Sequence, residues 1–139
     1  MKVAVIYWSG SGNTEAMADA FVDAIAEAGG SADKYFCGDF ETPMMPNYDA
    51  FAFGCPAQGT EELEPIEFYP TWWICKDKFE GKPVILFGSY GWGGGEYLLK
   101  NWKAEADESN VNVVATVVAN GPADDAVIAE IKAAAKALV

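Results

Sequence analysis

The stretch VAVIYWSGSGNTEAMADA, residues 3–20, places a buried strand, a loop of small residues and the start of a helix in immediate succession. Val3–Tyr7 is a continuous apolar run, which is typical of a strand buried on both faces of a parallel sheet. From about Asn13 to Ala28 apolar residues recur at helical spacing, and Gly29–Gly30 predict the end of that helix. This order of strand, loop and helix predicts one unit of an α/β fold.

Strand and helix patterns continue to alternate along the chain. Apolar runs predict four more strands, over residues 32–37, 48–53, 83–87 and 111–119. Apolar side chains at helical spacing predict three more helices. The first has Phe68, Trp72, Cys75 and Phe79 on its apolar face, the second has Leu98, Trp102 and Ala106, and the third has Val127, Ile131, Ala134 and Leu138. The alternation predicts a three-layer, doubly wound, five-stranded parallel sheet. A length of 139 residues with 51% hydrophobic content fits a single domain over residues 1–139.

Composition excludes several classes of function. The chain has no His and no Arg, which removes the usual zinc sites, His-based acid–base chemistry and arginine-finger catalysis. Its three cysteines are far apart, which disfavours disulfide scaffolds and four-thiolate iron–sulfur sites. A net charge of −12 disfavours nucleic acid and anionic membranes, and it serves either solubility or docking to basic partners. With no membrane span and no secretory signal, we expect a cytoplasmic protein.

Three predicted strands end in glycine-rich loops, at residues 8–14, 54–62 and 88–96. In open parallel sheets, ligands bind beyond the carboxyl ends of the strands, where the strand order reverses. The three loops are therefore expected along one edge of the sheet, around a ligand.

The first loop has the composition of an anion cradle without a cation. A helix start carries about half a positive charge and several N–H groups without helical partners, so it can hold phosphate unaided. Gly10 and Gly12 allow the backbone to curl, and hydroxyl or amide groups follow from Ser9, Ser11, Asn13 and Thr14. No Lys or Arg occurs from Val3 to Asp33, and both the P-loop lysine and the GxGxxG fingerprint are missing. The alternative is an ordinary turn in which Asn13 or Thr14 caps the helix.

The segments SGSGNT (9–14), GCPAQGTEELE (54–64) and FGSYGWGGGE (87–96) resemble those of the short-chain flavodoxins of anaerobic bacteria, and the resemblance covers essentially the whole chain. It implies the strand order 2-1-3-4-5 and non-covalently bound FMN. It also implies a low-potential one-electron carrier that shuttles between semiquinone and hydroquinone, has no substrate of its own and no metal, and acts as a monomer on basic-faced redox proteins.

The same resemblance implies an FMN site made of residues from all three loops. They are Ser9, Gly10, Ser11, Gly12, Asn13, Thr14, Pro56, Ala57, Gln58, Gly59, Thr60, Glu61, Ser89, Tyr90, Gly91 and Trp92.

Four of these residues are implied to contact the flavin ring. Trp92 would stack on the outer face, although a core or partner-contact role is the alternative. Gln58 stands where relatives often carry Met on the inner face. Glu61 would pair with the flavin N3–H, or else is a solvated acid. The Gly59 carbonyl would accept a hydrogen bond from the reduced flavin N5–H, worth roughly 1 kcal/mol, or about 45 mV.

The missing cations suit a low potential. A negative charge about 10 Å from an anionic flavin, at an effective dielectric near 40, costs roughly 0.8 kcal/mol, or about 35 mV. Neutral donors would hold the phosphate and leave its charge effective at the ring. Near this site Trp8 either packs against the ligand or belongs to the core, and Cys55 is expected to be a buried small hydrophobe rather than a reactive or metal-binding thiol.

Two other classes share this topology. An NAD(P)H-dependent FMN quinone reductase would need a basic nicotinamide subsite, which is not evident. A signalling receiver domain would need acids after the first strand and an Asp after the third, where this chain has Trp8–Ser9 and Gly54–Cys55.

Overall fold

Parallel strands form the central layer of this computed structural model, which describes residues 1–58, 62–91 and 93–139. The strands of the described chain are β1 (Lys2–Tyr7), β2 (Ser31–Phe36), β3 (Ala50–Gly54), β4 (Pro83–Tyr90) and β5 (Asn112–Asn120). Their order in the sheet is β2-β1-β3-β4-β5, with every pairing parallel. The predicted doubly wound sheet with strand order 2-1-3-4-5 is confirmed.

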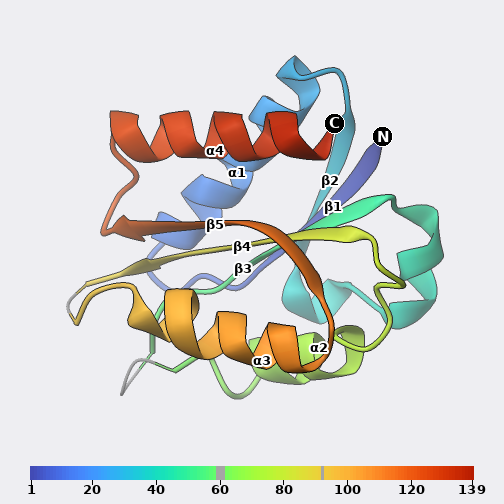
Figure 1. Ribbon diagram of the computed structural model, residues 1–139. Helices are drawn as coiled ribbons and strands as arrows, with labels where there is room; N and C mark the ends of the chain where they lie inside the picture. Colours follow the sequence, from blue (N-terminus) through green and yellow to red (C-terminus); the bar gives the residue numbers. More distant parts are fainter. Residues whose placement is uncertain (59–61, 92) are drawn as a thin grey trace.

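Helices cover both faces of the sheet (Figure 1). Helices α1 (Asn13–Glu27) and α4 (Asp125–Leu138) lie on one face, and α2 (Phe68–Cys75) and α3 (Lys103–Glu108) lie on the other. Alternate residues of β1 point to the two layers: Val3 and Val5 pack in the core of α1 and α4, and Ala4 and Ile6 pack in the core of α2 and α3. This double coverage explains why the strand is apolar along its length.

Four local features depart from the sequence patterns. Helix α2 ends at Cys75, and Phe79 is buried in the core from the segment beyond it. The third predicted helix begins with a π-helical segment, Tyr97–Trp102, which continues into α3. Short 3₁₀ helices at Cys37–Asp39 and Thr42–Asn47 occupy the connection between β2 and β3. β4 also extends three residues beyond its predicted end, to Tyr90.

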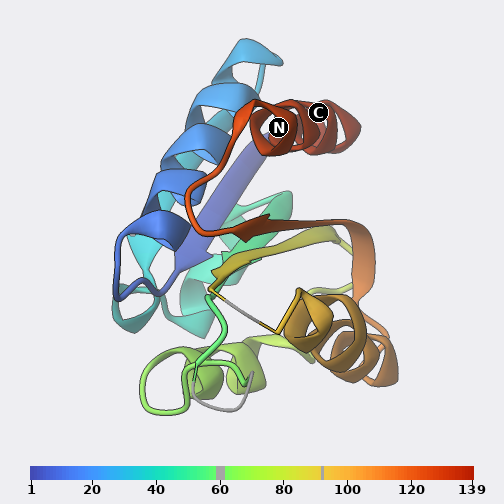
Figure 2. The same ribbon diagram turned by 90° about the vertical axis from the view of Figure 1, so that its left-hand side faces the viewer.

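The carboxyl ends of the strands share one edge of the molecule, which faces the viewer in Figure 2. The loops that follow β1, β3 and β4 all emerge at this edge. None of the described helices combines the length and apolarity that crossing a membrane would require.

The three cysteines are buried free thiols. Burial raises the pKa of Cys37 and of Cys75 to about 12, and it raises the pKa of Cys55 as well. Such thiols stay protonated at neutral pH and behave as small hydrophobes, as predicted for Cys55.

Candidate functional site

The three glycine-rich loops enclose one cavity of about 360 Å³ at the carboxyl edge of the sheet. The first loop contributes Trp8, Gly10, Ser11 and Asn13 to its lining; the second contributes Pro56, Ala57 and Gln58; and the third contributes Ser89, Tyr90 and Gly91. Gly121, after β5, completes the described lining. The structure therefore brings together residues from all three of the segments singled out in the sequence.

The first turn of α1 opens onto this cavity. Its N-cap is Gly12, whose φ of 99° belongs to the left-handed region that glycine adopts without strain. Within the described chain no side chain caps this helix. The Gly12 N–H donates to Ser9 Oγ at 3.1 Å, which curls the loop back on itself. The alternative, a turn capped by Asn13 or Thr14, is wrong, and backbone donors at the helix start are left for a ligand.

The Thr14 hydroxyl joins the first loop to the third. Its Oγ1 lies 2.9 Å from Ser89 Oγ, and both residues are buried. This contact crosses from the start of α1 to the end of β4, so it fixes two sides of the cavity relative to one another.

The second loop is closed at its base by two backbone hydrogen bonds. The Gln58 N–H donates to the Glu62 carbonyl at 2.8 Å, and the Glu62 N–H donates to the Gln58 carbonyl at 2.9 Å. The Ala57 N–H also donates to the Ser89 carbonyl at 3.0 Å, which ties this loop to the third. Gly59, Thr60, Glu61 and Trp92 lie outside the described residues, so their predicted contacts with the flavin ring stay predictions.

Glu64 holds the far side of this loop, a role that sequence reasoning missed. Its buried carboxylate accepts three backbone N–H groups, from Ile66 at 3.0 Å, Glu67 at 2.6 Å and Phe68 at 2.8 Å. Burial alone would raise the pKa of Glu64, but these hydrogen bonds outweigh it and lower the pKa. The carboxylate therefore supplies an internal anion to the start of α2. The backbone N–H of Glu64 donates to Cys55 Sγ at 3.3 Å.

Trp8 lines the cavity and also packs against the core on the side of α2 and α3, so it has both of the roles that the sequence left open. The Trp8 indole N–H donates to Glu67 Oε1 at 3.1 Å. A Cβ at Gly10 would lie 3.1 Å from the Trp8 ring, so glycine allows the loop to pass close to the indole.

Gly121 lines the cavity but was not predicted as a site residue. The sequence feature that could have indicated it is a glycine just after the last strand. Its N–H donates to the Tyr90 carbonyl at 2.8 Å.

The described lining of the cavity carries no charged side chain. Lys34, on β2, does reach the first turn of α1, but its ammonium pairs with Glu15 at 3.2 Å and with Asp19 at 2.8 Å. Tyr7 also donates to Glu15, at 3.0 Å. The positive potential at the cavity therefore comes from the helix start and its N–H groups.

These groups fit a ligand with two unlike parts. The start of α1, with its hydroxyls and N–H groups, suits a phosphate. The walls formed by Trp8, Ala57 and Tyr90 suit a flat aromatic ring. FMN has both parts, a phosphate tail and a planar ring.

Comparison with known proteins gives the same assignment. The family model described as Flavodoxin matches residues 5–134. A flavodoxin of Megasphaera elsdenii is 39% identical over 124 residues, which cover 89% of this chain and 90% of that protein. A flavodoxin of Clostridium beijerinckii is 42% identical over 94 residues, 68% of each chain. The solution structure of two-electron reduced Megasphaera elsdenii flavodoxin superimposes with a TM-score of 0.89 at 38% identity, over 98% of this chain and 97% of that one. The chain therefore belongs to the flavodoxin family, whose cofactor is FMN and whose members transfer electrons.

Proposed function

We propose that residues 1–139 form a single flavodoxin-like domain that works as a low-potential one-electron carrier, alternating between the semiquinone and hydroquinone of non-covalently bound FMN. It delivers electrons to basic-faced redox proteins, has no substrate of its own, and acts as a cytoplasmic monomer. The observation that carries the proposal is the uncapped start of α1, which opens into a cavity bounded by all three predicted loops.

The first loop holds the phosphate in this proposal. Backbone N–H groups at the start of α1 donate to it, and hydroxyls of Ser9 and Ser11 and the amide of Asn13 add donors. Thr14 and Ser89 are hydrogen-bonded to one another and join the first loop to the third. Their hydroxyls keep acceptor and donor capacity for a ligand oxygen.

The second and third loops hold the ring. Pro56, Ala57 and Gln58 supply one side, and Tyr90 and Gly91 the other. Trp92 would stack on the outer face of the ring, Glu61 would accept from the ring N3–H, and the Gly59 carbonyl would accept from the N5–H. When bound, FMN supplies the electron-accepting ring; the protein fixes its position and the charge around it.

The charge around the site favours a low potential. The described lining has no cationic side chain, and the whole chain has a net charge of −12. Each acid about 10 Å from the ring would make an added negative charge less favourable by roughly 0.8 kcal/mol. Glu62 and Glu67 lie in or beside the second loop, which borders the cavity.

Stepwise reduction of the purified holoprotein tests the proposal. We expect the visible spectrum to show a blue neutral semiquinone at near-stoichiometric yield before full bleaching. Direct two-electron bleaching, or steady oxidation of NADH or NADPH without a partner protein, would contradict a carrier and favour an enzyme.

A further inference from the structure

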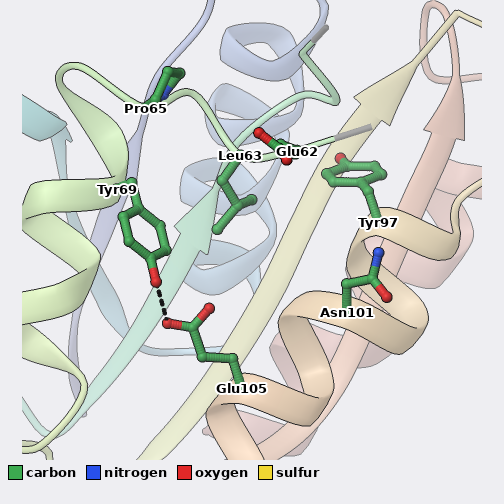
Figure 3. Close-up of a pocket in the computed structure, with 7 residues that line it drawn as sticks. All are labelled: Glu62, Leu63, Pro65, Tyr69, Tyr97, Asn101 and Glu105. Atoms are coloured by element: carbon green, nitrogen blue, oxygen red, sulfur yellow. Dashed lines mark hydrogen bonds between the residues drawn. The ribbon is translucent and has the colours of Figure 1, made fainter. Parts of the chain in front are cut away.

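A second cavity of about 360 Å³ lies between α2 and the segment formed by the π-helical turn and α3 (Figure 3). We call it the α2–α3 groove. Leu63, Tyr69 and Tyr97 give it apolar walls, and Asn101 and two carboxylates, Glu62 and Glu105, give it polar ones. Leu63 points into the space between the two helices, and Glu62 lies at its upper end in the view.

The groove holds one of its carboxylates in place. The Tyr69 hydroxyl on α2 donates to Glu105 Oε1 on α3 at 2.7 Å, so the bond crosses from one helix to the other. Burial, together with this bond to a carboxylate, raises the pKa of Tyr69 to about 12, so the hydroxyl remains a donor. The Tyr69 ring packs against Trp73, with centroids 5.9 Å apart.

Lysines on the same segment pair with other acids. Lys100 lies 3.3 Å from Glu96, and Lys103 lies 2.7 Å from Asp107, each one turn along the helix. Each cation is thus matched within its own helix, and the groove keeps a negative potential from Glu62 and Glu105.

The groove lies against the proposed cofactor cavity. Tyr97, which lines the groove, donates its hydroxyl to the Cys55 carbonyl at 2.7 Å, at the base of the second loop. Glu62, which also lines the groove, exchanges backbone hydrogen bonds with Gln58 in the lining of the other cavity. A partner bound in the groove would therefore contact the loop that also borders the cofactor site.

We propose that the α2–α3 groove receives a lysine or arginine side chain from a basic redox partner. The aliphatic stem would pack on Tyr69 and Leu63 while the charged head lies beside Glu105, and Glu62 at the other end of the groove adds a second negative charge. Exposed apolar Ile66 (77%) provides contact area for the rest of such a partner, whereas the Lys76 ammonium lies over the Trp73 ring at 4.1 Å. The inference rests on the proposed electron-carrier function, because it supplies that carrier with a docking point.

The test uses zinc-substituted cytochrome c, a basic haem-type protein that binds but accepts no electrons from the flavin. It is titrated at low ionic strength into oxidised holoprotein, with amide NMR shifts as the readout. Glu105→Gln removes the charge but keeps an oxygen that can accept from Tyr69. Glu108→Gln is the matched control, since it makes the same charge change at an exposed position of the same helix, outside the groove.

We expect amide NMR shifts at Leu63, Tyr69 and Asn101. Glu105→Gln should raise the dissociation constant about two- to fivefold, and the fold increase caused by Glu108→Gln should be less than half of that. Equal effects of the two variants, or shifts gathered on α1 and α4, would overturn the proposal. Because the probe takes no electrons, binding is measured separately from the reduction experiment, and either proposal can fail alone.

Discussion

Helices α1 and α2 both begin at the carboxyl edge of the sheet, yet their first turns are built in opposite ways. At α2, the buried carboxylate of Glu64 accepts three backbone N–H groups and neutralises the positive end of the helix from within. At α1, Gly12 occupies the N-cap and no described side chain caps the helix. The start of α2 is thus satisfied by the protein's own anion, while the start of α1 faces a cavity.

This difference separates structure from function at one edge of the fold. A helix start that carries its own carboxylate has no further need for an anion, and its energy contributes to folding. A helix start with only neutral donors can use its backbone N–H groups and its dipole to bind a phosphate. Charge changes at the two sites should therefore act on different quantities: FMN affinity at α1 and the free energy of unfolding at α2.

The largest effect is expected from making α1 resemble α2. Ser11→Asp places a carboxylate in the lining of the cofactor cavity. At about 5 Å from a doubly charged phosphate and an effective dielectric near 40, it costs about 3 kcal/mol, so FMN affinity falls roughly a hundredfold. Quenching of FMN fluorescence during titration of the apoprotein measures it. Ser31→Asp, at the other end of the strands, is the control; an equal loss there would refute the comparison.

Removing the carboxylate charge at the start of α2 by Glu64→Gln is expected to lower the free energy of unfolding by about 2 kcal/mol, measured by urea unfolding of the apoprotein. In Glu64→Gln the amide oxygen can still accept a hydrogen bond from a backbone N–H. The amide NH₂ is a donor and cannot accept, so it faces a backbone N–H without forming a hydrogen bond. Glu62→Gln, a change at an exposed residue of the same loop, should stay within about 0.5 kcal/mol.

The pH dependence of this second effect has a definite sign. The folded pKa of Glu64 is lowered, so its charge stabilises the fold fully above the pKa of the unfolded chain, near 4.3. That contribution is lost as the pH falls from there through the folded pKa. The stability difference between the wild type and Glu64→Gln should therefore shrink in acid; a difference that grows would contradict the assignment.

A smaller effect is expected at α4, where Asp124 caps the helix by accepting from the Val127 N–H at 2.9 Å. Asp124→Ala removes this cap, which costs about 1 kcal/mol of unfolding free energy. Thermal unfolding measures the loss. FMN affinity should stay unchanged, and a parallel loss of FMN binding would show that α4 also contributes to the cofactor site.

The sequence predicted the parallel sheet and the meeting of three loops because these depend on local patterns and on general rules of chain connection. The strand order came from the resemblance to flavodoxins, since those rules allow more than one order. The apolar run of β1 indicated a strand buried on both faces, and the small residues of the loop after it indicated a binding site for an anion. Trp8 remained open between site and core, since an aromatic residue at a strand end is compatible with both.

The Glu64 cap and the π-helical turn were not predicted, because no local pattern distinguishes them. Glu64 belongs to an acidic run, and nothing in the run distinguishes the one carboxylate that folds inward over the start of α2. The π-helical turn places the Tyr97 hydroxyl on the Cys55 carbonyl, where a Cβ at Gly88 would collide with both groups. That close approach joins residues 42 positions apart, so periodicity alone predicted an ordinary helix.

The most direct test of the central claim compares FMN with riboflavin, which lacks the phosphate, in the wild-type apoprotein and in Lys34→Gln. Two or more hydrogen bonds from neutral donors to the phosphate should make FMN bind at least about a hundredfold more tightly than riboflavin. Because Lys34 is paired with Glu15 and Asp19, the ratio should be the same in Lys34→Gln. Equal affinities for the two flavins, or a ratio that collapses in Lys34→Gln, would contradict a phosphate held by the helix start and neutral groups alone.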